Sequence, residues 1–160
     1  MEIVVSTGID CSVIIWDIST GDRITTLKGH TKWMLCVCFS PCGLFLASGS
    51  QDHTIVLWDC QSWTRIQTFR GHTSAVTSVT FSVTSDTILS SSEDGTVRVW
   101  SLVTNMEQLK IETRSIDVFS ASLNDANETI AVSCSGHVNI YGARTGELIQ
   151  SLGSLPKYIT

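Results

Sequence analysis

Residues 29–59 read GHTKWMLCVCFSPCGLFLASGSQDHTIVLWD, and this stretch alternates short apolar segments with turns. The segments Met34–Phe39, Leu44–Ser48 and Thr54–Trp58 are rich in β-branched, aromatic and other apolar residues. Gly, Pro, Ser and Asp separate them, and runs bounded in this way are typical of β-strands. The spacing leaves no room for an amphipathic helix, so we expect consecutive antiparallel strands.

The landmarks of this stretch recur along the chain with a period of 42 residues. A Trp-Asp pair stands one period earlier, a Trp-Ser pair stands one period later, and Tyr141 follows as a weaker copy. Such self-similarity predicts a repeat architecture in which each period forms one unit. The landmarks in register are Trp16, Trp58 and Trp100, then Gly29-His30 and Gly71-His72, then Asp10, Asp52 and Asp94.

Two of the predicted strands, VIIW at 13–16 and IVLW at 55–58, do not alternate apolar with polar residues. A strand of this kind is buried on both faces, so each small sheet is expected to lie between two others. Four-stranded sheets packed face to face around an axis form a β-propeller. The sequence therefore predicts an all-β propeller.

The Gly-His and Trp-Asp landmarks at this period resemble the WD-repeat (WD40) family, closely over residues 1–101 and loosely over 102–152. The resemblance implies blades of four antiparallel strands, about four blades here, and propellers that usually have seven. We therefore expect the remaining blades to come from a longer chain or a second copy. Residues 1–152 are predicted to form a propeller segment: a partial blade at 1–28, full blades at 34–70 and 76–112, a degenerate blade at 116–152, and a tail or further blade at 153–160.

In WD repeats a polar relay connects the strands of a blade, from a loop His to a turn Asp, a Ser or Thr on the second strand, and the Trp indole on the third. The resemblance assigns this structural role to matching residues of three blades. The set comprises Ser6, Asp10 and Trp16; His30, Ser48, Asp52 and Trp58; and His72, Ser90, Asp94 and Trp100.

The recurrent Ser, His and Asp also suggest a hydrolase triad or a metal site. Their even spacing follows the fold, no GxSxG elbow occurs, and His30 and His72 lack a nearby second ligand. The six cysteines form no CxxC pair and are interpreted as buried small side chains. We therefore expect no catalytic residues, no metal, no cofactor and no enzyme activity.

The resemblance also implies a partner-binding face, formed by the loops that enter the blades and the residue before each turn Asp. Trp33 is the most informative candidate, because an exposed aromatic can anchor an interface, although packing of the loop onto the blade explains it equally well. The candidates are Lys32, Trp33, Leu35 and Gln51 in one blade, and Ser74, Ala75, Thr77 and Glu93 in the next.

Composition limits the partners and the compartment. The chain is 42% hydrophobic and 16% charged, with a net charge of −5 and scattered Lys and Arg, so neither nucleic acid nor a membrane is indicated. No targeting segment is visible at the N-terminus. We expect an intracellular location, cytoplasmic by default, with the nucleus left open.

The first functional hypothesis is a non-catalytic protein–protein interaction scaffold, a WD-repeat module that assembles a multiprotein complex with other proteins. A second is the sensor or regulatory part of a larger NACHT/NB-ARC-type signalling ATPase, whose P-loop would lie elsewhere because these residues contain none. A third is a substrate receptor of a ubiquitin ligase. For one adaptor class the required Arg after Trp-Asp is absent from WDIS, WDCQ and WSLV.

Overall fold

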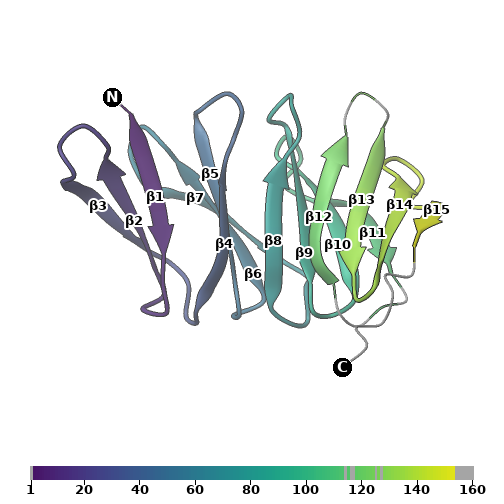
Figure 1. Cartoon of the computed structure of the whole chain (residues 1–160). Coiled ribbons are helices and arrows are strands. Elements are labelled where there is room, and N and C mark those ends of the chain that lie inside the picture. The colour runs from purple at the N-terminus through teal and green to yellow at the C-terminus, as the bar shows by residue number, and fades with distance from the viewer. Residues whose placement is uncertain (1, 114, 116–117, 125, 127, 154–160) are drawn as a thin grey trace.

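The computed structural model describes residues 2–113, 115, 118–124, 126 and 128–153, and their regular structure is antiparallel β-strand (Figure 1). Of the predicted tail at 153–160, only Gly153 falls within the described residues. The strands are β1 (Ile3–Thr7), β2 (Ser12–Asp17), β3 (Arg23–Lys28), β4 (Met34–Phe39), β5 (Phe45–Ser50), β6 (Thr54–Asp59), β7 (Arg65–Arg70), β8 (Val76–Phe81), β9 (Thr87–Ser92), β10 (Thr96–Ser101), β11 (Glu107–Glu112), β12 (Val118–Asn124), β13 (Thr129–Cys134), β14 (His137–Gly142) and β15 (Leu148–Leu152).

These strands form four sheets that stand side by side in chain order (Figure 1). We call them blade 1 (β1–β3), blade 2 (β4–β7), blade 3 (β8–β11) and blade 4 (β12–β15). Blade 1 has three strands and the others have four, and every pairing is antiparallel between consecutive strands. The predicted all-β fold of propeller blades is therefore confirmed.

The blades pack on one another through apolar faces. Strand β6 is buried along TIVLW, as expected for a strand without alternation, and β10 is buried along its whole length. In β2 the expectation holds on one face only, because Val13 and Ile15 are buried while Ile14 and Trp16 are partly exposed. Three hydrophobic clusters lie between successive blades, and the second of them joins Ile55 and Phe69 of blade 2 to Val76 and Trp100 of blade 3. Burial of these faces is the main stabilising contribution to the stack.

Strand β5 runs to Ser50, two residues beyond the predicted Leu44–Ser48 segment. Gly49 pairs with Cys36, and a Cβ built on Gly49 would lie 2.6 Å from the Cys36 sulfur and 2.7 Å from Val76. This glycine therefore permits close approach of blades 2 and 3 within the strand, whereas the sequence pattern predicts the start of a turn there.

The first strand of each four-stranded blade carries a β-bulge near its start. Leu35, Thr77 and Phe119 are each skipped in the ladder, between the pairs that flank them. A bulge redirects the side chain of the extra residue, and it does so here beside the loops that enter the blades.

Figure 1 shows these entering loops and the turns after β1, β5 and β9 along one edge of the structure, at the bottom of the view. We call this edge the loop face, and it comprises residues 8–11, 29–35, 51–53, 71–77 and 93–95. Backbone hydrogen bonds join its parts, from Gln51 N to Trp33 O at 2.9 Å and from Glu93 N to Ala75 O at 3.0 Å.

The part of the chain that the structure describes contains no helix with the length and hydropathy required for a bilayer span.

Candidate functional site

Blade 2 brings together the four residues that the repeat pattern aligns. His30 enters from the loop before β4, and its Nδ1 lies 3.0 Å from Asp52 Oδ2 in the turn after β5. Its Nε2 lies 2.9 Å from Ser48 Oγ on β5, and the Trp58 indole on β6 donates to the same oxygen at 2.9 Å. A continuous hydrogen-bonded chain therefore crosses the blade from its loop to its third strand.

Blade 3 repeats this arrangement with nearly the same distances. His72 Nδ1 lies 2.9 Å from Asp94 Oδ2, and His72 Nε2 lies 2.8 Å from Ser90 Oγ. Trp100 donates its indole N–H to Ser90 Oγ at 2.9 Å. Because a carboxylate can only accept, Nδ1 of each His carries a proton. In the neutral form of His72, Nε2 then accepts from the Ser90 hydroxyl.

The electrostatics of blade 3 favour a neutral His beside an ionised Asp. Burial lowers the pKa of His72, although hydrogen bonding to Asp94 opposes that shift. Burial alone would raise the pKa of Asp94, but hydrogen bonds from Thr96, Thr73 and His72 outweigh it and place the pKa at about 2. The same balance lowers the pKa of Asp52.

This contact geometry resembles a Ser-His-Asp triad, but the environment differs from that of a nucleophile. Ser48 on β5 and Ser90 on β9 are buried within their blades, and each oxygen already interacts with both His and Trp. A catalytic serine must reach a substrate carbonyl. The arrangement can therefore hold strands together, and it presents no hydroxyl to solvent.

Blade 1 contains part of the same set. Trp16 donates its indole N–H to Ser6 Oγ at 2.8 Å, as in the later blades. Asp10 is exposed and accepts from the Ser12 hydroxyl at 2.7 Å. The Trp–Ser half of the chain is thus present here, and Asp10 bonds within its own turn.

Blade 4 places its polar groups on a different strand, and sequence reasoning missed this. Val132 stands where Ser48 and Ser90 stand, and it pairs in register with Asn139. Asn139 Nδ2 donates to Tyr141 Oη at 3.3 Å, and Tyr141 donates to Thr113 O at 3.5 Å. The buried Asn139 Oδ1 has no hydrogen-bond partner among the described residues.

On the loop face, the candidate residues of blade 2 expose apolar surface. Trp33 is 51% exposed and Leu35, the bulge residue, is 41% exposed. Lys32 beside them is exposed, and Gln51 is half-buried. The backbone bond between Gln51 and Trp33 places these positions together.

The corresponding positions of blade 3 have a different character. Ala75 is buried, and the Thr77 hydroxyl donates to Val118 O of blade 4 at 3.1 Å. Ser74 donates to the exposed Glu93 carboxylate at 3.3 Å. The loop face of blade 3 is therefore polar, and Thr77 joins two blades.

Ile9 is an exposed residue that sequence reasoning did not select. It lies in the turn between β1 and β2 and is 73% exposed. Met34 N donates to Gly8 O at 3.4 Å, which places this turn beside the loop that carries Trp33. The repeat pattern contains a signal for it, because Ile9 precedes Asp10 as Gln51 precedes Asp52. We call Ile9, Trp33 and Leu35 the apolar patch.

Within the described residues, no group of three or more His, Cys, Asp or Glu side chains could hold a metal ion. All six cysteines are free thiols, but only Cys134 is buried and Cys42 is exposed, so the interpretation of all six as buried side chains is wrong. Burial raises the pKa of Cys36 to about 12, in keeping with a protonated side chain packed between blades.

The stacked four-stranded sheets with a His–Asp–Ser–Trp chain define a β-propeller built from repeats. The family model described as WD domain, G-beta repeat matches residues 21–59 and 63–101, which cover the outer strand of one blade and the inner strands of the next. The chain therefore belongs to the WD-repeat family.

Several curated proteins are similar over about one repeat. The Nuclear distribution protein PAC1 of Arthroderma otae is 45% identical over 51 residues, which are 32% of this chain and 11% of that protein. The Set1 complex component swd1 of Schizosaccharomyces pombe is 46% identical over 41 residues, which are 26% of this chain and 10% of that protein. The Lissencephaly-1 homolog of Dictyostelium discoideum is 44% identical over 39 residues, which are 24% of this chain and 9% of that protein. Each match thus spans about a tenth of the relative.

Proposed function

We propose that this chain is a non-catalytic interaction scaffold that helps to assemble a multiprotein complex, with its partner protein docked on the loop face. The observation that carries the proposal is the apolar patch of Ile9, Trp33 and Leu35. One named relative is by its name a component of a complex, which supports a role of this kind.

The patch has the composition of an interface centre. Trp contributes large contact area and is enriched among the residues that dominate binding energy. Adjacent exposed apolar side chains mark interaction sites more often than scattered ones do. Lys32 and Gln51 lie beside the patch and can supply the polar rim that surrounds such a centre.

The neighbouring loops limit the extent of the apolar contact. In blade 3 the same positions carry buried Ala75, hydrogen-bonded Thr77 and acidic Glu93. We therefore expect a partner that inserts an apolar side chain over blades 1 and 2 and extends polar or basic groups toward Glu93. The matched relatives give no support to the signalling-ATPase and ubiquitin-ligase alternatives.

Site-specific photo-crosslinking tests the proposal and captures a partner whose identity need not be known beforehand. A benzophenone amino acid is placed at position 32, next to Trp33 and exposed, so that the patch itself stays intact. In a matched control it is placed at position 103, where Val103 is also exposed but lies in the turn between β10 and β11. We expect one discrete protein adduct from position 32 and none from position 103. Equal labelling from both positions, or no adduct from either, would contradict the proposal.

A further inference from the structure

Blade 3 carries two cations directly opposite one another. Arg98 on β10 pairs in register with Lys110 on β11, so both side chains lie on the same face of the sheet. Like charges in this relationship destabilise a sheet. In blades 2 and 1 the matching pairs are neutral: Val56 with Thr68, and Ile14 with Thr26. The cationic pair is therefore a feature of this blade that the repeat fold does not require.

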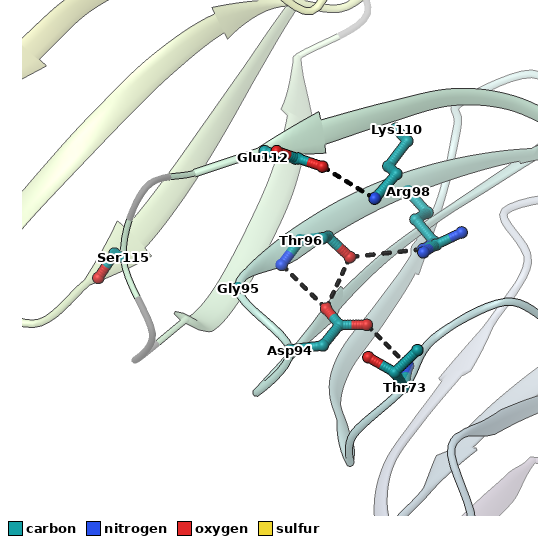
Figure 2. A pocket seen from close by; sticks show the side chains of 8 residues that line it. All are labelled: Thr73, Asp94, Gly95, Thr96, Arg98, Lys110, Glu112 and Ser115. Atoms are coloured by element: carbon teal, nitrogen blue, oxygen red, sulfur yellow. Dashed lines mark hydrogen bonds and ion pairs between the residues drawn. The ribbon is translucent and has the colours of Figure 1, made fainter.

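A pocket of about 370 Å³ adjoins this pair. Figure 2 shows Arg98 and Lys110 next to each other on the side of the blade that also bears Thr96 and Asp94, with Thr73 below them. The Arg98 side chain is only about 10% exposed. Glu107 pairs with this largely buried charge, which offsets the cost of burying it, and Arg98 is thereby held in place beside the pocket.

The acidic groups around the pocket already have donors. Asp94 accepts from Thr96 N, Thr96 Oγ1, Thr73 N and His72 Nδ1. Glu107 pairs with Arg98 Nη1, and Glu112 accepts from Lys110 Nζ at 2.9 Å. The pocket therefore needs no additional cation.

The donors, in contrast, are in excess. Arg98 uses Nη1 for Glu107 and Nε for Thr96 Oγ1, and within the described residues neither its Nη2 nor the hydroxyl of Thr73 has a hydrogen-bond partner. Lys110 and Glu112 form an exposed pair, which is weak and can exchange partners. A ligand rich in acceptor oxygens would complete this set.

We propose that Arg98, Lys110 and Thr73 bind the phosphate group of a phosphate monoester in this pocket. Arg98 can donate from Nη2 while it keeps its pair with Glu107, and Lys110 can exchange the exposed Glu112 for the phosphate. A guanidinium matches phosphate oxygens in geometry. The Thr73 hydroxyl can donate to a further oxygen. The pocket volume lies in the range of small-molecule sites and exceeds what a phosphate ion alone fills, so it accommodates the carbon atoms attached to the ester oxygen.

Isothermal titration calorimetry on the 160-residue chain tests this site, with O-phosphoserine and inorganic phosphate as separate ligands at constant ionic strength and pH 7.5. The variants Arg98→Val and Lys110→Thr install the residues that blade 2 carries at the same positions. The repeat thus supplies replacements that the fold accommodates, and circular dichroism verifies the β-structure. Arg65→Ala removes an exposed cation from β7 outside the pocket and serves as the matched control.

We expect phosphoserine to bind the wild-type chain and to lose affinity about tenfold or more in each pocket variant, with Arg65→Ala unchanged. Tighter binding of phosphoserine than of inorganic phosphate would support a monoester. Binding of inorganic phosphate alone would overturn the monoester and assign the pocket to the free ion. The site itself would be refuted if neither ligand bound, or if Arg98→Val and Lys110→Thr bound as tightly as the wild type.

Discussion

The hydroxyl of Ser48 lies 2.9 Å from Nε2 of His30, and it accepts the indole N–H of Trp58 from the other side. Ser48 is therefore the point where the loop and the third strand of blade 2 are joined. Ser90 holds the same place in blade 3. These His, Ser and Trp side chains are buried. If a substitution removes one of them, water cannot reach the others to replace the lost hydrogen bond.

Asp94→Ala should destabilise the chain strongly. The substitution leaves donors on Thr73, Thr96 and His72 without their acceptor. A buried group left unpaired costs about 1–3 kcal/mol, so we expect a loss of about 3 kcal/mol in the free energy of unfolding, measured by urea denaturation. Asp22→Ala, at an exposed turn, should change it by less than about 0.5 kcal/mol. Similar losses in both variants would refute a structural role for Asp94.

The same groups predict how stability depends on pH. His72 and Asp94 both have pKa values lower in the folded chain than their ordinary values, so the unfolded chain binds more protons in acid. The contribution of these two groups to the free energy of unfolding should be fully present above about pH 6.5. It should fall below that pH as His72 takes up a proton, and fall again between about pH 4 and about 2 as Asp94 protonates. Urea midpoints across this range measure the effect. In Asp94→Asn the decline in the lower range should become shallower, and an unchanged slope would contradict the assignment.

Asn139→Val should not weaken the fold. The substitution removes a buried acceptor without a described partner and installs the residue that blade 2 carries at this register position. It also removes the 3.3 Å bond to Tyr141, which is long. We expect a change between no loss and a gain of about 1 kcal/mol in the free energy of unfolding. A loss above about 1 kcal/mol would show that Asn139 Oδ1 has a partner that stabilises blade 4.

The cysteines should differ in reactivity according to their surroundings. Hydrogen bonds from Ser40 and Ser85 lower the pKa of the exposed Cys42 thiol, whereas burial raises the pKa of Cys36 to about 12. The thiolate is the reactive form, so iodoacetamide at pH 7.5 should label Cys42 first and Cys36 last. Peptide mass spectrometry over a time course measures the order. Faster labelling of Cys36 than of Cys42 would contradict the described packing.

The strands and their order were predictable because the 42-residue period places every landmark in one register. Trp58 and Trp100 are one period apart, and each stands in the third strand of its sheet. The apolar run at 55–58 correctly predicted a strand buried on both faces, whereas in the run at 13–16 Ile14 and Trp16 are partly exposed. The boundary of β5 was wrong by two residues, because Gly49 serves there for close packing between blades.

Features that depend on departures from the period were harder to predict. In blade 4 the turn between β13 and β14 is one residue shorter than the matching turns of blades 2 and 3. Val132 replaces the serine of the second strand, and the polar side chain is instead Asn139, its pairing partner on the third strand. The Arg98–Lys110 pairing requires the register of β10 with β11, which the sequence does not display. The exposure of Ile9 follows from its turn lying beside the loop of the next blade.

The apolar patch as a protein-docking surface is the central claim, and the affinity of the partner identified by crosslinking tests it most directly. The dissociation constant is measured with purified partner for the wild type, for Trp33→Ala and for Val103→Ala, whose side chain is exposed outside the loop face. Truncation of an anchoring Trp costs about 2 kcal/mol or more, so Trp33→Ala should bind about 30-fold more weakly, and Val103→Ala should match the wild type. Equal affinity of Trp33→Ala and the wild type would contradict the account.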